Sequence, residues 1–422
     1  MRLCLKNIGK IKTACVEING ITVIGGNNDT GKSTVGKALF AVFNSLHRSD
    51  EKIANERFDS IENLIIRFYG DVTGQIYFHL DCLDRIRDLF THGHSQYSNS
   101  YLKNSIYEII RQSDEEIFSK ATEDDIARFL TNVDENLRIN DDEIFRRVFQ
   151  RRLDAEFNEQ TSNQFVPDED GEITLDIRDE RITVGIKDNT VLGLNKWINL
   201  GTEAIYIDDP YVLDETRQRM FFDRRSAADH RTHLRQKLNT TAKETNIVEE
   251  IVATNKLSTI YGKLSAVCPG EIVRGKRKTT SYKVAGSDKE FRLQNLSTGL
   301  KMFVILKELL LRGLIEPNGT IILDEPEIHL HPAWQLLFAE LIVLLHCEFG
   351  LHILLNTHSP YFLNAIEVYS AKYGVDDRCK YYLAREDGDV SYIDDVTNNI
   401  ERIYSKLARP LQDLENERYS DD

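Results

Sequence analysis

Gly26-Asn27-Asn28-Asp29-Thr30-Gly31-Lys32-Ser33 is the stretch that decides the fold of this chain, because it fits the pattern G-x-x-x-x-G-K-[ST]. An apolar run at 21–24 precedes it, and residues with helical spacing follow from Thr34 onward. In a strand, turn and helix of this kind, successive backbone N–H groups wrap a phosphate at the helix N-terminus. We therefore predict a phosphate-binding loop over Gly26 to Thr34, in which Lys32 reaches the terminal phosphates and Ser33 ligates Mg²⁺.

A second motif lies almost three hundred residues later, where Thr320-Ile321-Ile322-Leu323 is followed by Asp324 and Glu325. The four β-prone residues predict a buried parallel strand. Carboxylates at the C-terminal end of such a strand lie where open α/β sheets bind ligands. We expect Asp324 to hold the metal opposite Ser33 and Glu325 to act as a general base on water.

Two further motifs follow the same logic. Leu296-Ser297-Thr298-Gly299-Leu300-Lys301 opens an apolar helical run, so Ser297 is an N-cap and could, with Gly299, offer a helix N-terminus to a γ-phosphate. Leu354-Leu355-Asn356-Thr357-His358-Ser359-Pro360 predicts another strand, ending in a histidine. We expect His358 to contact the γ-phosphate and steady the water.

These four motifs together resemble those of the ABC-type ATPases, and within them the SMC-like and OLD-like branch. The string Asp324-Glu325-Pro326-Glu327-x-His329-x-His331-Pro332 resembles the OLD-like members in particular, and the match covers residues 1–50 and Asn295 to Tyr369. The resemblance implies an α/β fold: an ABC-ATPase (P-loop NTPase) head with a mainly helical insertion between the phosphate loop and the signature motif.

The resemblance also implies a homodimer, or a higher homo-oligomer, that encloses two ATP molecules with Mg²⁺. In such a dimer Ser297, Gly299, Lys301 and His331 would act in trans on the nucleotide of the partner protomer. Thr298 replaces the usual second glycine of the signature, and His331 stands where many relatives have an aspartate. Gln75 is the candidate for the Q-loop glutamine.

Composition narrows the class of protein. Hydrophobic residues make up 41% and charged residues 29% of the 422 residues, which indicates a globular chain. The N-terminus has no signal-peptide pattern, and the apolar tract 336–355 is interrupted by Glu340, His346 and Glu348. We expect a cytoplasmic protein with no membrane span and six cysteines that are reduced thiols rather than disulfides or zinc ligands.

A formal net charge of −15 argues against a surface that coats nucleic acid generally. Two local basic stretches, 217–243 and 274–278, leave a choice open. They are either a solvated helical face and a charged hairpin turn, or a patch for nucleic acid or a partner protein.

We expect three regions: residues 1–100 and 271–422 as the two parts of the ATPase head, and 101–270 as a mostly helical insertion suited to oligomer or partner contacts. Within the insertion, 105–157 predicts short helices, 171–208 predicts strands with a turn at Asp188-Asn189, and 209–260 predicts helix. Residues 270–293 predict a hairpin, and Asp387-Gly388-Asp389 predicts a hairpin turn rather than a metal site.

The resemblance leads to a functional hypothesis. The stretch after His358 is too short for the TOPRIM nuclease domain of many OLD-like proteins, and the format is similar to the ATPase subunit of Septu-type anti-phage systems. That similarity implies a slow ATPase that controls a partner nuclease of the HNH type. One alternative is a DNA-binding, repair-type SMC-like ATPase. Another is a built-in ribonuclease, for which the Arg-x4-His pairs Arg87/His92 and Arg225/His230 are weak, coincidence-level candidates.

Overall fold

The computed structural model describes residues 1–74, 80–91, 97–214, 228–240, 257–274 and 280–420. Its contacts divide the chain into two compact units. Unit 1 comprises Met1–Asn44, Arg151–Lys196 and Gly201–Asp422, and unit 2 comprises Ser45–Gln150 and Trp197–Leu200. This division differs from the expected boundaries at 100 and 270, because the helical unit already begins at Ser45 and most of 151–270 belongs with the ATPase motifs.

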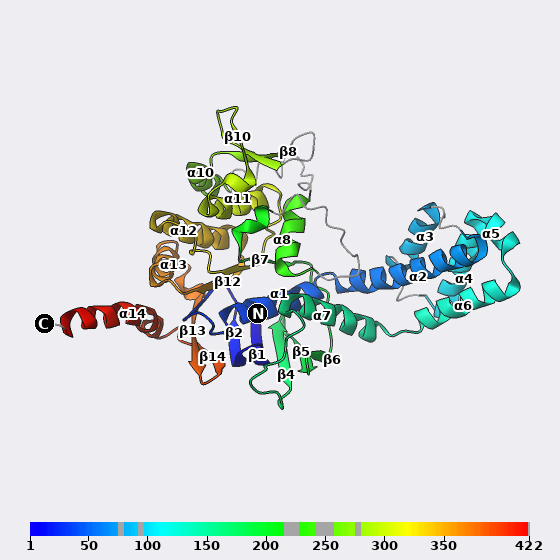
Figure 1. Ribbon diagram of the computed structural model, residues 1–422, viewed down its shortest axis with the longest axis horizontal. Helices are drawn as coiled ribbons and strands as arrows, with labels where there is room; N and C mark the ends of the chain where they lie inside the picture. Colours follow the sequence, from blue (N-terminus) through cyan, green and yellow to red (C-terminus); the bar gives the residue numbers. More distant parts are fainter. Residues whose placement is uncertain (75–79, 92–96, 215–227, 241–256, 275–279, 421–422) are drawn as a thin grey trace. The chain divides into compact units, whose positions relative to one another are not determined.

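Unit 1 is built on an 11-stranded mixed sheet with the order β6-β5-β4-β1-β2-β14-β13-β3-β12-β11-β7 (Figure 1). The strands are β1 (Arg2–Ile8), β2 (Ile11–Glu17), β3 (Ile21–Gly25), β4 (Gly171–Ile177), β5 (Glu180–Lys187), β6 (Thr190–Leu194), β7 (Ala204–Ile207), β11 (Thr320–Asp324), β12 (His352–Thr357), β13 (Cys379–Asp387) and β14 (Val390–Asp395). The insertion therefore supplies four strands to this sheet and is not simply helical.

The parallel part of the sheet positions the predicted motifs. Strand β12 pairs in parallel with both β3 and β11, and β7 pairs in parallel with β11. All residues of β3, β7 and β11 are buried, as expected for parallel strands covered on both faces. Because parallel strands end at the same edge, the phosphate loop, the acidic pair and His358 are brought together there.

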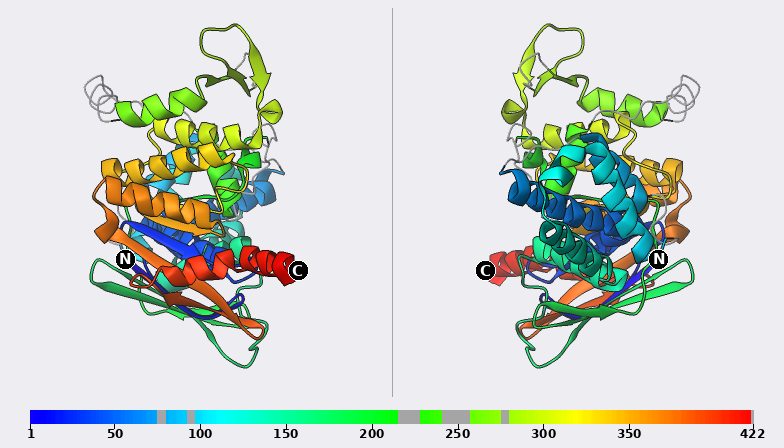
Figure 2. Two further views of the ribbon diagram at one scale, coloured as in Figure 1. Left: turned by 90° about the vertical axis from the view of Figure 1, so that its left-hand side faces the viewer. Right: turned by 90° about the vertical axis from the view of Figure 1, so that its right-hand side faces the viewer.

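Helices cover this sheet, and Figure 1 shows α11 (Thr298–Leu311), α12 (Pro332–Phe349) and α13 (Pro360–Lys372) following one another along one side of it. A second sheet of three antiparallel strands, in the order β10-β9-β8, precedes α11. In both views of Figure 2 the antiparallel strands β4, β5, β13 and β14 lie at one end of unit 1 and the small sheet lies at the other.

The remaining elements of unit 1 are α1 (Lys32–Leu46), which crosses into unit 2, η2 (Pro210–Leu213), α8 (His230–Asn239), α10 (Ser258–Val267), β8 (Glu271–Arg274), β9 (Thr280–Lys283), β10 (Glu290–Arg292), η3 (Leu293–Asn295), η4 (Asp376–Arg378) and α14 (Glu401–Ser420).

Helix α12 is the one described helix that is long and apolar enough to cross a membrane by composition alone. Its side chains instead lie in the main core of unit 1, where Phe338 and Leu341 pack among buried residues of α11 and the sheet. The same helix buries Glu340, whose carboxylate bonds to Lys263, Lys372 and Tyr373. This agrees with our reading of the apolar tract as buried core.

Unit 2 consists of helices around a separate core. Phe58, Phe68, Ile106 and Phe129 are among its buried residues, and Phe68 stacks on Phe129 with ring centroids 4.8 Å apart. Its helices are α2 (Ser49–Thr73), α3 (Leu80–Thr91), α4 (Asn99–Ser113), α5 (Glu115–Lys120), α6 (Glu123–Leu137) and the first part of α7 (Asp141–Phe157). The short helices expected over 105–157 are present, whereas the strand-like stretch around Gln75 lies outside the described residues.

Two predicted turns are confirmed. Asp188 and Asn189 join β5 to β6 with φ values of 48° and 64°, and Gly388 joins β13 to β14 with a φ of 63°. Positive φ at such positions is typical of tight hairpin turns. The hairpin expected over 270–293 is also present, with β10 added as a third strand.

The expectation of six free thiols is wrong for one pair. Cys4 and Cys15 are direct partners in the antiparallel β1–β2 ladder and are joined in a disulfide. The sequence does not reveal this pairing, since the two residues are 11 apart and only the register of the hairpin brings them opposite each other. Cys82, Cys268, Cys347 and Cys379 are free.

Candidate active site

The phosphate loop lies between β3 and the first turn of α1. Asp29 and Gly31 adopt φ values of 62° and 81°, so the loop makes the tight turn that the motif requires. A side chain at Gly31 would have its Cβ 2.9 Å from Ile11 Cγ1, which explains the glycine at this position. Thr30 is buried and donates to the Asn27 carbonyl at 2.8 Å.

Lys32 is turned onto its own loop. Its Nζ donates to the carbonyls of Gly26 at 3.1 Å and Asn27 at 2.6 Å, and it lies 3.7 Å from Glu325 Oε1. Burial lowers the pKa of this ammonium, and the nearby carboxylates of Glu325 and Asp324 partly oppose that effect. A hydrogen bond from an ammonium to a phosphate is stronger than one to a neutral carbonyl, so an incoming phosphate can replace the carbonyls as the partner of Lys32.

Asp324 is held firmly at the end of β11. Its Oδ2 accepts from the Tyr206 hydroxyl at 2.8 Å and its Oδ1 accepts from Asn356 Nδ2 at 2.9 Å. These donors come from β7 and β12, the two strands that flank β11. Gly36 on α1 makes room for the arrangement, because a Cβ there would lie 3.0 Å from the Tyr206 hydroxyl.

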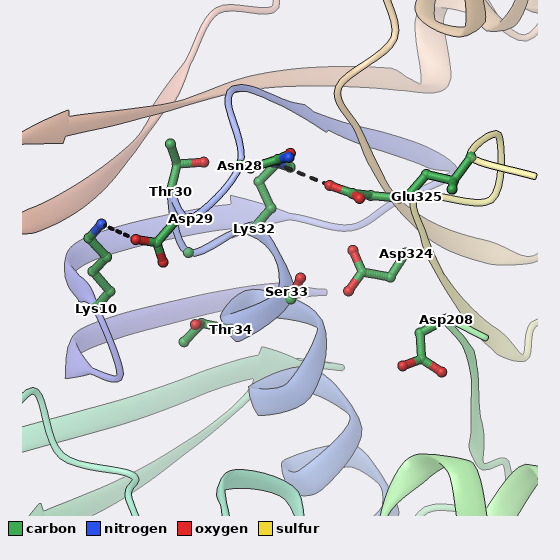
Figure 3. Close-up of a pocket in the computed structure, with 12 residues that line it drawn as sticks. Lys10, Asn28, Asp29, Thr30, Lys32, Ser33, Thr34, Asp208, Asp324 and Glu325 are labelled. Atoms are coloured by element: carbon green, nitrogen blue, oxygen red, sulfur yellow. Dashed lines mark hydrogen bonds and ion pairs between the residues drawn. The ribbon is translucent and has the colours of Figure 1, made fainter.

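Glu325 and His358 lie next to each other at the same edge. Glu325 Oε1 is 3.3 Å from His358 Nδ1, and both side chains are partly exposed. The backbone of Glu325 has a φ of 50°, an unfavourable conformation for a non-glycine residue, and its N–H donates to the Asn356 carbonyl at 2.9 Å. The turn thereby aims this carboxylate at the phosphate loop, as the ion pair with Lys32 in Figure 3 shows.

Glu327 is a neighbour that sequence reasoning noted only as part of a motif. Its side chain is 2% exposed, and its Oε1 accepts from the Thr357 hydroxyl and from the His358 N–H at 3.3 Å. Burial raises the pKa of this carboxyl, with the Thr357 bond opposing. Glu327 therefore fixes the backbone that carries His358.

Asp208 is the residue that sequence reasoning missed. It directly follows β7, and it lines the same cavity as Ser33 and Asp324 (Figure 3). Burial raises its pKa, but the contacts with His230 and Arg231 outweigh burial and hold the pKa of this carboxyl below its usual range. An available signal was the sequence Ala204-Ile205-Tyr206-Ile207-Asp208, an apolar strand with an acid at its end, like the one that flagged Asp324.

The residues around the cavity fit a nucleotide with a magnesium ion. The cavity has a volume of about 420 Å³ and is lined by the phosphate loop on one side and by Asp208, Asp324 and Glu325 on the other. Ser33 is exposed to it. Within the part of the chain that the structure describes, no three His, Cys, Asp or Glu side chains form a ready metal cage. A magnesium ion here would therefore take some of its ligands from the protein and the others from the phosphates and water, as Mg²⁺ commonly does.

The signature motif forms a second, separate pocket of about 450 Å³. Ser297 caps α11 and His331 caps α12, so two helix N-termini meet there. Gly299 is buried against α12, and a Cβ at that position would lie 2.8 Å from the His329 carbonyl. Two converging helix N-termini favour an anion.

Lys301 does not fit the expectation that it acts in trans. Its side chain is 1% exposed, its Nζ lies 2.8 Å from Asp214 Oδ2, and it sits over the Tyr211 ring at 4.8 Å. The Lys301 side chain therefore packs inward, against residues of its own chain. In this structure it supports the motif from within its own chain.

The basic stretch 217–243 is described in part, and its described cations are engaged within the chain. Arg231 pairs with Asp208, Lys237 pairs with Glu203, and Arg235 is buried. The remaining cations of this stretch, and 275–279, lie outside the described residues. So do His92 and Arg225 of the two Arg-x4-His pairs.

The other members of those pairs are accounted for. His230 is buried with Nδ1 2.5 Å from Glu156 Oε1 and Nε2 3.0 Å from Asp208 Oδ2. Burial lowers its pKa, but these two carboxylates outweigh burial and raise the pKa to about 9. Arg87 lies over the Phe58 ring at 4.4 Å.

Comparisons with known proteins bear on this site. Residues 1–363 match the family described as "AAA ATPase domain". Similar solved structures include the SMC head domain from Thermotoga maritima, with 13% identity, a TM-score of 0.38, and coverage of 94% of this chain and 98% of that chain. Another is the SMC head bound to the C-winged helix domain of ScpA, with 12% identity, a TM-score of 0.43, and coverage of 93% and 96%. At such identities and TM-scores, these likenesses support no conclusion about partners.

Proposed function

This chain belongs to the AAA ATPase domain family. We propose that two copies of it enclose ATP and hydrolyse it to control a partner protein. The observation that carries the proposal is the meeting of Lys32, Asp324, Glu325 and His358 at one edge of the parallel strands. Four side chains from three sequence regions converge there with the chemistry that phosphoryl transfer needs.

We assign each residue of the site a role in this proposal. The loop N–H groups and Lys32 would bind the phosphates, Ser33 and Asp324 would hold Mg²⁺, and Glu325 would accept a proton from the attacking water. Bound Mg²⁺ would neutralise charge on the phosphate oxygens. His358 Nδ1 lies 3.3 Å from Glu325 Oε1, so we expect His358 to steady that carboxylate and the γ-phosphate.

The second copy completes the site. The pocket at Ser297, Gly299 and His331 lacks any residue of the phosphate loop, yet its two helix N-termini favour an anion. We propose that it receives the γ-phosphate held by the other protomer. Lys301 is left out of this set, because its pairing with Asp214 directs it inward.

The finer proposal is that this ATPase is the regulatory subunit of a bacterial anti-phage complex with an HNH-type nuclease. It rests on the resemblance of the motifs to those of the OLD-like branch. In support, the described residues after His358 form α13, two strands that pair with β3 and β2 of the ATPase sheet, and α14. Those residues thus belong to the ATPase fold itself. ATP would then shift the dimer toward the conformation that binds ATP more tightly, and this conformation would set the state of the partner nuclease.

The test is co-purification. The chain is expressed with its neighbouring open reading frame and captured by a tag on the chain. The mass and composition of the purified material are then determined with and without ATP and Mg²⁺. We expect a defined complex that contains a nuclease and whose composition or nuclease activity changes with ATP. Lys32→Ala, which should bind ATP more weakly, serves as the control at an ATP concentration that saturates only the wild type. A lone dimer in all conditions, with ATP-dependent DNA binding, would replace this proposal with a direct nucleic-acid role.

A further inference from the structure

The proposed function assigns no role to the carboxylate of Asp208, although that side chain lines the cavity. Asp208 lines it together with Ser33 and Asp324, and Figure 3 shows the three on the same side of the pocket, away from Lys10. It reaches this place because β7 runs parallel to β11 and ends at the same edge.

The two oxygens of Asp208 differ in their contacts. Oδ2 accepts from Arg231 Nε at 2.8 Å and from Arg231 Nη2 at 2.6 Å, and it lies 3.0 Å from His230 Nε2. Among the described residues, Oδ1 has no hydrogen bond or ion pair. One oxygen is therefore anchored and the other is left for the cavity.

The histidine of this anchor is buried, whereas the side chain of Arg231 is 54% exposed. His230 is 6% exposed, and its Nδ1 lies 2.5 Å from Glu156 Oε1. The His230 ring stacks on Tyr206 with centroids 4.2 Å apart, and the Tyr206 hydroxyl holds Asp324. One buried cluster thus orients both carboxylates of the metal side of the pocket.

We propose that Asp208 is a second carboxylate ligand of the hydrated magnesium ion of the ATP site, and that His230 is its positioning residue. This inference rests on the proposed ATP function. Mg²⁺ in phosphate sites keeps several waters and uses one or two carboxylates, which Asp324 and Asp208 would supply. Outer partners such as His230 orient ligands and are needed for full metal affinity.

The contribution of Asp208 is one of orientation more than of charge. Arg231 and His230 offset its negative charge, while the hydrogen-bond partners of Asp324 among the described residues are the neutral Tyr206 and Asn356. We therefore expect loss of Asp208 to weaken metal binding by about tenfold, at the low end of what outer-shell and ligand changes cost.

The experiment uses the full chain with saturating ADP, so that hydrolysis does not interfere. Bound Mn²⁺ is measured from the electron paramagnetic resonance signal of free Mn²⁺, and ADP affinity is measured separately in EDTA. Asp208→Asn should raise the half-saturating Mn²⁺ concentration by about tenfold and leave ADP affinity in EDTA unchanged. Asp208→Glu should restore part of the loss, and His230→Gln should shift Mn²⁺ binding in the same direction as Asp208→Asn.

The matched control is Asp209→Asn. Asp209 is the adjacent acid, but its Oδ1 accepts from the Tyr211 N–H at 2.8 Å, outside the cavity lining. Wild-type Mn²⁺ binding in both Asp208→Asn and Asp208→Glu would overturn the assignment. A His230→Gln variant that loses ADP affinity in EDTA as well would show a merely structural role for that residue. If the wild-type chain binds no nucleotide at all, the proposed function fails together with this inference.

Discussion

At the scale of single residues, Glu325 carries the sharpest prediction. Glu325→Gln removes the proposed base while keeping the side chain's size, so ATP hydrolysis should fall by about a hundredfold or more. ATP affinity should be retained, because the phosphates are bound by the loop. Phosphate release and nucleotide binding are measured on the same preparation. The control is Glu348→Gln, because Glu348 is an exposed carboxylate in the last turn of α12. Unchanged turnover would remove Glu325 from the mechanism.

Lys32 gives a complementary prediction. Lys32→Ala takes away a charge-assisted contact to phosphate, which is worth about 1.5–3 kcal/mol, so ATP affinity should fall at least about tenfold. Fluorescence titration with a labelled ATP measures the change. Lys37→Ala, one turn further along α1 and outside the cavity lining, should bind like the wild type. Full affinity in Lys32→Ala would refute the phosphate-loop assignment.

The residues that could be predicted from sequence are those with a local motif. Lys32, Asp324 and His358 each sit in a short pattern with a clear strand before it, and the structure brings them to one edge. Asp208 and His230 could not be placed in the same way. The short pattern at 204–208 marks Asp208 as an acid at the end of a strand, but it does not say that this strand pairs with β11. The place of His230 depends on how α8 packs, which no short pattern indicates.

At the scale of elements, Glu340 ties three helices together. This buried carboxylate of α12 bonds to Lys263 of α10 and to Lys372 of α13. Glu340→Gln should lower the free energy of unfolding by about 2 kcal/mol at neutral pH, because hydrogen bonds to a charged group are lost. Chemical denaturation measures this change, and Glu348→Gln should leave stability nearly unchanged.

The same residue gives a pH dependence. Burial raises the pKa of Glu340, but the contacts with Lys263 and Lys372 outweigh burial and lower it to about 2. Because its folded-state pKa is depressed, Glu340 stabilises the fold fully above its ordinary pKa of 4.5, and the contribution fades as the pH falls toward 2. The stability gap between wild type and Glu340→Gln should therefore narrow over this range. A constant gap would contradict the ion-pair account.

The sequence predicts whether a segment is a helix or a strand better than it predicts which sheet a strand joins. The helices within 105–157 and the strands within 171–208 have periodic sequences, and both are present. Alternation of apolar residues does not say which sheet a strand will join, however. Strand β4 pairs with β1, more than 160 residues away, and so residues that we assigned to an insertion belong to the main sheet.

At the scale of the whole molecule, the proposed dimer predicts complementation. Lys32→Ala destroys the phosphate loop of one chain, and Ser297→Arg blocks the signature pocket of the other. Each variant alone should be inactive. A mixture should recover part of the ATPase activity, because mixed dimers contain one intact composite site.

Exchange of subunits is checked with two differently tagged wild-type chains, which must co-purify after mixing. If subunits exchange and the mixture of variants stays inactive, the signature pocket does not act in trans. Activity of Ser297→Arg on its own, at the wild-type level, would lead to the same conclusion.

The sheet order has a consequence for how the protein is made. Strand β3, which leads into the phosphate loop, pairs only with β12 and β13, whose residues lie more than 320 positions later. A nascent chain that ends before His352 therefore contains the nucleotide loop but neither of the two strands that pair with β3. Such long-range pairing makes folding slow and late. We therefore expect ATP to bind the nascent chain only after β12 and β13 have been synthesised.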